Sequence, residues 1–279
     1  MYHRYHRLNS YKRNQFGGMT SRRARGGSVK GRLVMGLLFA AFTIGSYFFS
    51  GEHNEITGTT QYVSISEREE IALGLQAVPH MLDQYGGLAP NADQQRTLDK
   101  IGNRLVRNSV ARNTDWQYEF HLLADKKTVN AFALPGGQIF ITQALFERLP
   151  SDDHVAGVIG HEIGHVIARH GAQQMAKQRL TQGLTGAAVM ASGDYRMGQL
   201  AMMIGNMVNM KYGREDELES DTLGVRLMHE AGYDPYALID VMDVLEKASG
   251  GASHQAEFFS THPNPENRRE QIREAIAKL

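Results

Sequence analysis

The chain has 279 residues, 42% hydrophobic and 22% charged, which is ordinary for a globular protein with one sizeable domain or two small ones. It has no cysteine, which excludes disulfides, a lipidated N-terminal cysteine and any cysteine-ligated metal site. The zero net charge is the sum of a basic N-terminal part and an acidic remainder. Residues 1–51 carry nine Lys or Arg and no acid, whereas the remainder carries 21 basic and 30 acidic residues. We therefore expect the two parts to face different surroundings, and we expect no nucleic-acid partner.

The 17 residues from Leu33 to Phe49 carry no charge. As a helix they reach about 26 Å, just enough to cross a hydrocarbon core of about 30 Å if flanking residues snorkel. This pattern predicts a transmembrane signal anchor over 33–50, with the basic tail 1–32 held in the cytoplasm. A cleaved signal peptide and a mitochondrial presequence are the alternatives. The long basic region, with no A-x-A cleavage site after the apolar segment, favours the anchor.

Residues 51–64 are polar and predict a linker, which leaves 65–279 for one domain. Ser66 and Glu69 form a capping box that opens a helix running to about Gln84. Hydrophobic periodicity and capping residues predict further helices at 91–109, 151–171, 214–231, 235–248 and 265–279. Asn264 is the expected N-cap of the last of these helices.

Strands are expected between the second and third helices. Alternating apolar residues predict one strand within 116–125. Two apolar runs around Pro135-Gly136-Gly137 predict a strand–turn–strand unit that leads into a helix at Gln143. Residues 175–210 are rich in Gly, Ala and Met, but Asp194 and Arg196 make them a poor membrane span, so two helices are expected there. These helices either fill the core or form a flexible wall over a cleft.

The stretch VIGHEIGHVIARHG, residues 158–171, raises the question of a metal site. On a helix, His161 and His165 project within about 40° of each other, as two ligands of one ion require. Glu162 lies about 100° round from His161, where a general base acting on water should be. The alternative is a buried helix that happens to contain histidines, although buried histidines need partners. The ligand side also carries small residues that predict room for an ion and a substrate, namely Gly157, Gly164 and Ala168.

Two nearby histidines fail the geometric test for the same ion. His170 lies nine positions after His161, about 180° round an unbroken helix, so we interpret it as a helix-end residue favoured by the dipole. His154 is on the ligand side but two turns away, about 10 Å along the axis. Neither histidine is expected to bind the ion.

A third ligand is expected from GREDELESDTLGVRLMHEAG, residues 213–232. On a helical wheel, Glu217 and Asp221 lie in the middle of the apolar face, where leucine would be expected. A buried carboxylate is tolerated when it binds a cation or accepts hydrogen bonds. We assign Glu217 to the metal and Asp221 to the second ring nitrogen of a ligand histidine. Two His and one carboxylate with an open fourth position are typical of a catalytic zinc site.

HEIGH followed by ELESD, preceded by NAFALPGG and followed by STHPNPENR, resembles the gluzincin family of HtpX, BepA and the CAAX prenyl proteases. The similarity runs from about residue 60 to 279, and the single-anchor quality-control branch resembles the chain most. One departure is Ser220, which stands where the family usually has alanine. The chain has one expected spanning helix where the prenyl proteases have many, so a prenylated substrate is not expected.

The resemblance implies an α+β, mostly α-helical domain, a zincin-like HExxH helix bundle with a small antiparallel or mixed sheet. It implies one Zn²⁺ per chain, held by His161, His165 and Glu217, with Glu162 as the catalytic base and Asp221 as the supporting acid. His262, in the THPNP loop, is expected near the active site. There it would steady the oxyanion or approach the metal in a resting state, and Arg268 would anchor its loop. A lone loop histidine is otherwise an exposed bystander.

The strand GQIFITQ is a plausible exposed edge with which an extended peptide could pair; an ordinary core strand is the alternative. The expected substrate-binding residues are Asn130, Gly136, Gly137, Gln138 and Ile139. We therefore predict a membrane-anchored zinc endopeptidase that cleaves unfolded or extended polypeptides in protein quality control. Its domain is expected in the periplasm of a bacterial inner membrane, or alternatively at the mitochondrial inner membrane. The competing function is a non-catalytic, chaperone-like peptide-binding module that retains a metal. The sequence leaves the oligomeric state open.

Overall fold

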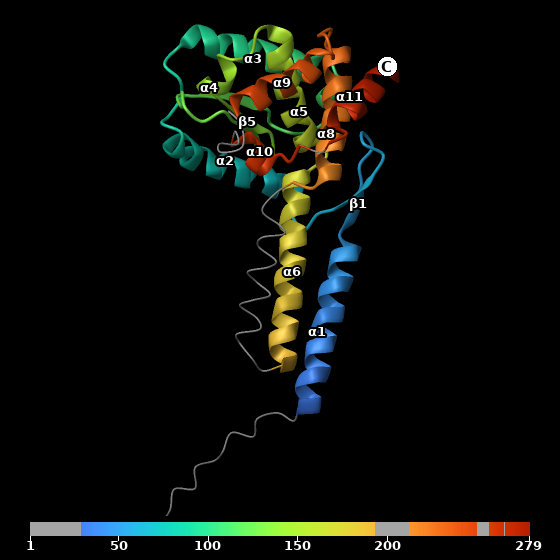
Figure 1. The fold of residues 1–279 in the computed structure, drawn as a ribbon. Helices are drawn as coiled ribbons and strands as arrows, with labels where there is room; N and C mark the ends of the chain where they lie inside the picture. Colours follow the sequence, from blue (N-terminus) through green and yellow to red (C-terminus); the bar gives the residue numbers. More distant parts are fainter. Residues whose placement is uncertain (1–28, 193–211, 250–256, 265) are drawn as a thin grey trace, which may run out of the picture.

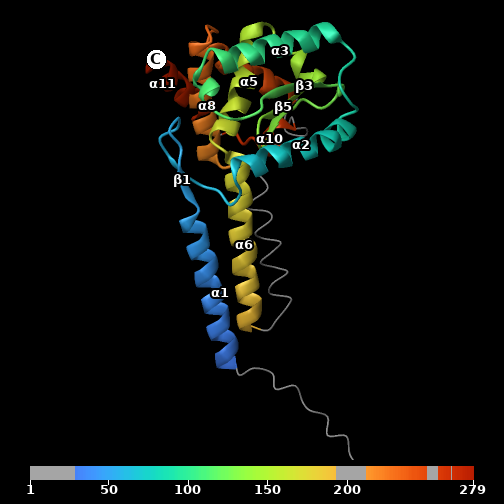
Figure 2. The same cartoon turned by 180° about the vertical axis from the view of Figure 1, so that it is seen from behind.

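The computed structural model describes residues 29–192, 212–249, 257–264 and 266–279. A mostly helical domain with small sheets rests on two long helices, α1 (Val29–Phe49) and α6 (His170–Ser192), which lie side by side below it (Figures 1 and 2). This confirms the predicted α+β, mostly α-helical fold class. Within the described ranges, α1 is the one helix long and apolar enough to cross a membrane. The predicted anchor therefore coincides with α1, which begins four residues earlier than expected.

The segment after α1 is folded, although the sequence predicts a linker there. Strand β1 (Gly51–His53) pairs antiparallel with β2 (Thr60–Tyr62), and the Asn54 side chain accepts bonds from two backbone N–H groups of the connecting turn. The same side chain donates to the backbone oxygen of Ile167 at 2.8 Å. Polar side chains thus bind the hairpin to the domain. A polar composition is the same in such a hairpin and in a linker, so the sequence alone does not distinguish them.

The first helices of the domain follow their predicted caps. Helix α2 (Glu67–Gln84) opens with the Ser66 capping box, and α3 (Ala92–Arg107) opens with Asn91 as N-cap. A 3₁₀ turn, η1 (Val110–Asn113), then leads towards the sheet.

A three-stranded mixed sheet forms the next layer. Its strands are β3 (Glu119–Leu123), β4 (Ala131–Leu134) and β5 (Gln138–Thr142), in the order β3-β5-β4. β5 pairs parallel with β3 and antiparallel with β4, so it is the central strand and is buried throughout. The expectation of an exposed edge at GQIFITQ is therefore wrong. The edge strand of the strand–turn–strand unit is β4, because β3 occupies the other side of β5.

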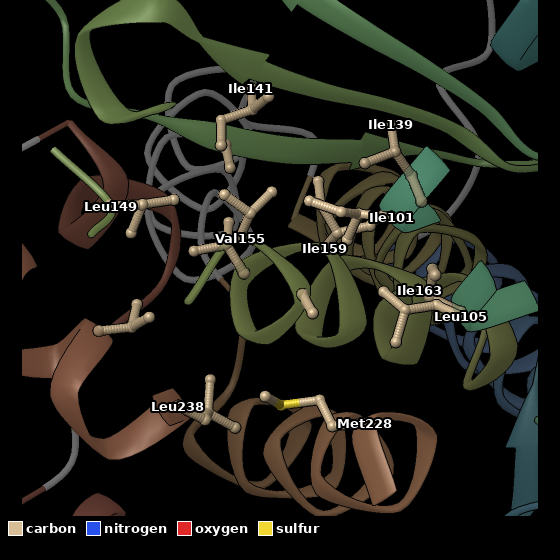
Figure 3. Close-up of a cluster of buried hydrophobic side chains, with 14 of the residues drawn as sticks. Ile101, Leu105, Ile139, Ile141, Leu149, Val155, Ile159, Ile163, Met228 and Leu238 are labelled. Atoms are coloured by element: carbon tan, nitrogen blue, oxygen red, sulfur yellow. The ribbon is translucent and has the colours of Figure 1, made fainter. Parts of the chain in front are cut away.

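Helix α5 (Asp152–Ile167) passes through the centre of the domain. Ile159 and Ile163 pack towards Ile101 and the β5 residue Ile139, while Met228 and Leu238 approach from the opposite side (Figure 3). These last two belong to α8 (Arg214–Glu230) and α9 (Ala237–Ala248). The remaining helices are the short α4 (Gln143–Phe146), α10 (Phe258–Thr261) and α11 (Arg268–Ala277).

Within the domain, two helix boundaries differ from the sequence prediction by three residues or more. Helix α5 ends at Ile167 instead of Gly171, because Arg169 adopts a positive φ of 53° and breaks the helix before α6 begins at His170. Helix α11 begins at Arg268 with Asn267 as N-cap, three residues later than predicted, and Pro265 lies outside the described residues. Of the predicted helical segment 175–210, α6 covers the part up to Ser192; the remainder, 193–210, lies outside the described residues.

Candidate metal centre

Four side chains from three parts of the chain meet beside α5. His161 and His165 come from α5, Glu217 from α8, and His262 from the residue after α10, and all four are buried. One potential ligand atom from each lies within 4.8 Å of all the others. The Nε2 atoms of His161 and His165 are 3.1 Å apart, and each lies 3.5 Å from an oxygen of Glu217. The structure thus brings the three predicted metal ligands together.

Glycines let α5 and α8 approach closely enough for this meeting. A Cβ atom at Gly164 would lie 2.8 Å from the backbone oxygen of Ser220, and one at Gly160 would lie 3.4 Å from that of Gly224. The small residues on the ligand side were expected to leave room for an ion and a substrate. Gly164 instead makes room for the backbone of α8, which carries Glu217 into the site, whereas Gly157 faces Leu238 of α9.

Asp221 and Arg268 orient His161. Asp221 Oδ1 lies 2.8 Å from His161 Nδ1, and Arg268 donates to both Asp221 oxygens, at 2.6 and 2.9 Å. Burial tends to raise the pKa of Asp221, but Arg268 and His161 outweigh it and lower that pKa below its ordinary value. The ionised carboxylate holds the proton of His161 on Nδ1, which leaves Nε2 as a lone-pair donor facing the cluster.

His170 contacts the second ligand histidine, which the sequence did not predict. Its Nδ1 lies 2.9 Å from His165 Nδ1, and its Nε2 lies 3.0 Å from an oxygen of Glu219. On an unbroken helix His170 would point away from His161. The break at Arg169 turns it back towards the site. Ser220 Oγ lies 3.3 Å from the same Nδ1, so the residue that departs from the family pattern also belongs to this contact.

Glu162 is fully buried, and neither of its oxygens accepts a hydrogen bond from the described residues. One of them lies 3.7 Å from His262 Nε2. Burial raises the pKa of Glu162, although His262 and His161 act against this. A carboxylate with a raised pKa and no partner is suited to accept a proton from a bound water molecule.

His262 is as buried as the α5 histidines, so it is not the exposed bystander of the alternative interpretation. Its ring stacks on Phe258 with centroids 4.4 Å apart, and its Nδ1 lies 3.0 Å from Glu217 Oε1. Burial tends to lower the pKa of His262, but Glu162 and Glu217 raise it above its ordinary value.

The donor set fits a divalent cation. Besides the Glu162 oxygens, His262 Nε2 is buried without a hydrogen-bond partner among the described residues, and Glu217 Oε2 is buried with Arg268 Nη1 3.2 Å away. Burial tends to raise the pKa of Glu217, but His262 and His165 lower it well below its ordinary value. Burial also lowers the pKa of His165 well below its ordinary value, which favours the neutral imidazole. Neutral imidazoles beside an ionised carboxylate are the forms that bind zinc.

A cleft of about 510 Å³ opens beside this cluster, between α2, the β4 edge and α6. Tyr212, which stacks on His165 with centroids 4.2 Å apart, is part of its wall. Further lining residues come from the β4 region and from both ends of α10: Asn130, Phe132, Leu134, Pro135, Glu257 and His262. The cleft is therefore continuous with the candidate metal centre.

Of the five predicted substrate-binding residues, only Asn130 lines this cleft. Gln138 and Ile139 are buried in the central strand. Gly136 and Gly137 form the β4–β5 turn with φ of 85° and 110°. A Cβ atom at Gly136 would lie 2.4 Å from Ile71, so glycine is required there by packing against α2. Nothing local in the sequence marks Tyr212 as a cleft residue, because it reaches His165 only through the tertiary fold.

Residues 92–276 match the model of peptidase family M48. The chain belongs to peptidase family M48. It is 29% identical over 243 residues to the mitochondrial metalloendopeptidase OMA1 of Schizosaccharomyces pombe, covering 85% of this chain and 71% of that protein. It is 27% identical over 252 residues to the beta-barrel assembly-enhancing protease of Escherichia coli K12, covering 84% of this chain and 50% of that protein. The M48 chain thus spans about half the length of this second relative.

A plant relative is more similar over a shorter stretch. The mitochondrial metalloendopeptidase OMA1 of Arabidopsis thaliana is 34% identical over 184 residues, which is 65% of this chain and 36% of that protein. The M48 match includes every residue of the four-membered cluster, together with Glu162, Asp221 and Arg268. The family resemblance inferred from the sequence motifs is therefore confirmed.

Proposed function

We propose that this M48 peptidase is a membrane-anchored zinc endopeptidase that cleaves unfolded or extended polypeptides. The observation that carries the proposal is the meeting of His161, His165 and Glu217 around one point. Beside them lies Glu162, a buried carboxylate without a hydrogen-bond donor among the described residues. Three ligands, two histidines and a carboxylate, would let a zinc ion also take a water molecule or a substrate carbonyl, as catalytic zinc sites do.

In this mechanism each side chain of the site has a separate role. His161, His165 and Glu217 would hold one zinc ion, which supplies a Lewis acid that polarises the scissile carbonyl and acidifies water. Glu162 takes the proton from the attacking water and delivers it to the leaving amine. Asp221 keeps the proton of His161 on Nδ1, so that Nε2 remains available as a ligand.

His262 has two roles that its position supports. Its Nε2 is buried beside Glu162 and has no hydrogen-bond partner among the described residues, so a protonated imidazole would be available to donate a hydrogen bond to the developing oxyanion. Its Nδ1 lies 3.0 Å from Glu217 Oε1 and 3.5 Å from His161 Nε2, so a neutral His262 would be able to approach the metal in a resting state. Arg268 contacts both Asp221 and Glu217, which ties α11 and the preceding loop to the site.

The substrate would pair with β4 instead of the strand predicted from the sequence. Thr142 N donates to Asn130 O, so hydrogen-bonded pairs with β5 fall at 130, 132 and 134. The backbone groups of Ala131 and Ala133 then point to the edge of the sheet with which no described strand pairs. An extended peptide that hydrogen-bonds to this edge would lie beside His165 and Tyr212. Recognition through the backbone tolerates many sequences, which suits a protease that clears unfolded chains.

The location follows from α1 and its flanks. The nine positive charges before residue 52 favour a cytoplasmic N-terminus, so the domain would lie outside the cytoplasm of a bacterial inner membrane. The mitochondrial inner membrane is the alternative, in keeping with the relatives named mitochondrial metalloendopeptidase. An alkaline phosphatase fusion after residue 60 in bacteria should be active; an inactive fusion would reverse the orientation.

The decisive experiment measures casein cleavage by the full-length protein in detergent. We expect activity that a chelator abolishes and that stoichiometric zinc restores. The Glu162→Gln variant should bind zinc but not cleave. Zinc and peptide binding without chelator-sensitive cleavage by the wild-type protein would favour the chaperone-like binding module instead.

A further inference from the structure

Helix α6 leaves the domain in the same direction as α1. In Figures 1 and 2, which view the molecule from opposite sides, the two helices remain neighbours over most of the length of α1. From composition alone the segment 175–210 is a poor membrane span, because Asp194 and Arg196 interrupt it. The described part of α6 ends before both of these charges.

The contact between the two helices is close enough to define their register. A Cβ atom at Gly36 would lie 2.8 Å from both Ala187 O and Ala191 Cβ, and one at Gly183 would lie 2.4 Å from Thr43 Cγ2. Gly183 therefore faces Thr43, while Ala191 faces Gly36, which is seven residues earlier in α1. The helices run antiparallel with their backbones almost touching, which is a packing common between membrane helices.

This register fixes the depth of α6 relative to α1. The α1 positions that face it, from Gly36 to Thr43, lie inside the uncharged stretch that begins at Leu33. On the other faces of α1, Leu37 and Phe42 are 69% and 72% exposed, so they need hydrocarbon around them. A neighbour in backbone contact with the same stretch must lie at the same depth.

The composition of α6 changes from charged to uncharged at the depth where the helix comes alongside α1. Lys177 and Arg179 are its last charged residues, and Leu180–Ser192 carries none. Those 13 residues reach about 20 Å along a helix axis. Leu184 and Met190 point away from the core of the described structure, with 37% and 41% of their surface exposed.

Polar groups collect where the two helices meet the domain. Arg179 donates to the backbone oxygen and hydroxyl of Ser64, at 3.1 and 2.9 Å. Tyr47 stacks on Tyr62 of β2 with ring centroids 5.0 Å apart. Aromatic and basic residues at this level are typical of a membrane–water interface. Deeper in the helix pair, the Thr43 hydroxyl donates to Phe39 O within α1, so it does not need water.

We propose that the C-terminal half of α6, Leu180–Ser192, lies in the hydrocarbon of the bilayer beside α1. The domain then rests on two membrane-embedded helices instead of one flexible anchor. This inference depends on the anchor role of α1 in the proposed function. Because α6 begins at His170, which contacts His165, its embedded half is continuous with a helix that starts at the candidate metal centre.

The absence of cysteine makes the proposal directly testable by single-cysteine labelling. The full-length chain would carry Ala188→Cys or Met190→Cys on the embedded half of α6. Gln178→Cys, above the interface, is the exposed control, and Leu37→Cys on α1 is the embedded control. Each protein is placed in lipid vesicles opened by freeze–thaw and treated with a charged maleimide, with labelling in SDS as the total. Maleimides react with the thiolate, which does not form in hydrocarbon. The melting temperature of each variant checks that it is folded, because Gln178 lines the cleft beside the candidate metal centre.

We expect Gln178→Cys to label rapidly and the other three variants at least tenfold more slowly, with all four labelling fully in SDS. Labelling of Ala188→Cys and Met190→Cys as fast as Gln178→Cys, while Leu37→Cys stays protected, would overturn the embedded α6 and leave the anchor intact. Rapid labelling of Leu37→Cys would remove the anchor itself, and this inference with it, without bearing on the peptidase site.

Discussion

The contact between His170 and His165 predicts a large effect on metal binding from a residue outside the ligand set. His170 Nε2 faces the Glu219 carboxylate at 3.0 Å, so in the neutral imidazole this nitrogen carries the proton and Nδ1 is the acceptor. His165 Nδ1, 2.9 Å away, must then be the donor. The pair therefore fixes the tautomer of His165 that leaves its Nε2 lone pair facing Glu217.

Replacing His170 with alanine removes that acceptor. Loss of such a supporting hydrogen bond typically weakens metal binding 10- to 100-fold, which corresponds to about 1.4–2.8 kcal/mol. His170→Asn should recover much of the loss, because its side-chain oxygen can accept where Nδ1 does. The assay is competition for zinc against a chromogenic chelator with the full-length protein in detergent.

Two controls separate this effect from general damage. His154→Ala, near the N-terminal end of α5, should leave zinc affinity unchanged, since His154 bonds Ser151 far from the cluster. The melting temperature of the zinc-free His170→Ala protein shows whether the fold survives the cavity. A folded His170→Ala protein with zinc affinity within twofold of wild type would refute the tautomer argument.

Four further outcomes are expected. Glu162→Gln should lower casein cleavage by at least about 10²-fold while the zinc content stays at one ion per chain; near-normal turnover would exclude Glu162 as the base. Dialysis against a chelator should abolish cleavage and lower the melting temperature, and zinc should restore both, because an ion that binds only the folded state stabilises it. Ala133→Pro should lose cleavage and keep its melting temperature, whereas Ala133→Ser should keep both; equal activity would remove the β4 edge from substrate binding. Arg169→Met should destabilise the domain by about 3–5 kcal/mol, because it leaves the buried Glu70 without its cation, and the melting temperature should fall. Glu70→Gln should destabilise the domain less.

Local patterns predicted most of the individual elements. The capping box at Ser66 and the periodicity of the α3 and α8 segments placed those helices within a few residues, because caps and hydrophobic spacing act over one or two turns. Helix geometry alone put His161 and His165 on one side of α5. The position of Glu217 in an apolar face indicated that its helix meets the same site, although spacing cannot say how closely.

Errors arose where a neighbour distant in sequence decided the outcome. GQIFITQ is apolar whether it is central or at an edge, and only the parallel pairing with β3 makes it the central strand. Gly164 was predicted to leave room for an ion, but the backbone of α8 occupies that room. His170 was placed by extending a helix that in fact breaks at Arg169, a residue held there by Glu70 and Glu52.

The sequence by itself determined the chemistry: two histidines and a glutamate at helical spacing, two carboxylates on an apolar helix face, and an uncharged stretch long enough to cross a membrane. Only the tertiary structure decided which groups meet them. His262, His170, Tyr212 and the β4 edge reach the site through contacts between segments far apart in the chain. Local sequence periodicity specifies the direction of a side chain from its own helix, but the distance between two helices depends on the packing of all the residues between them.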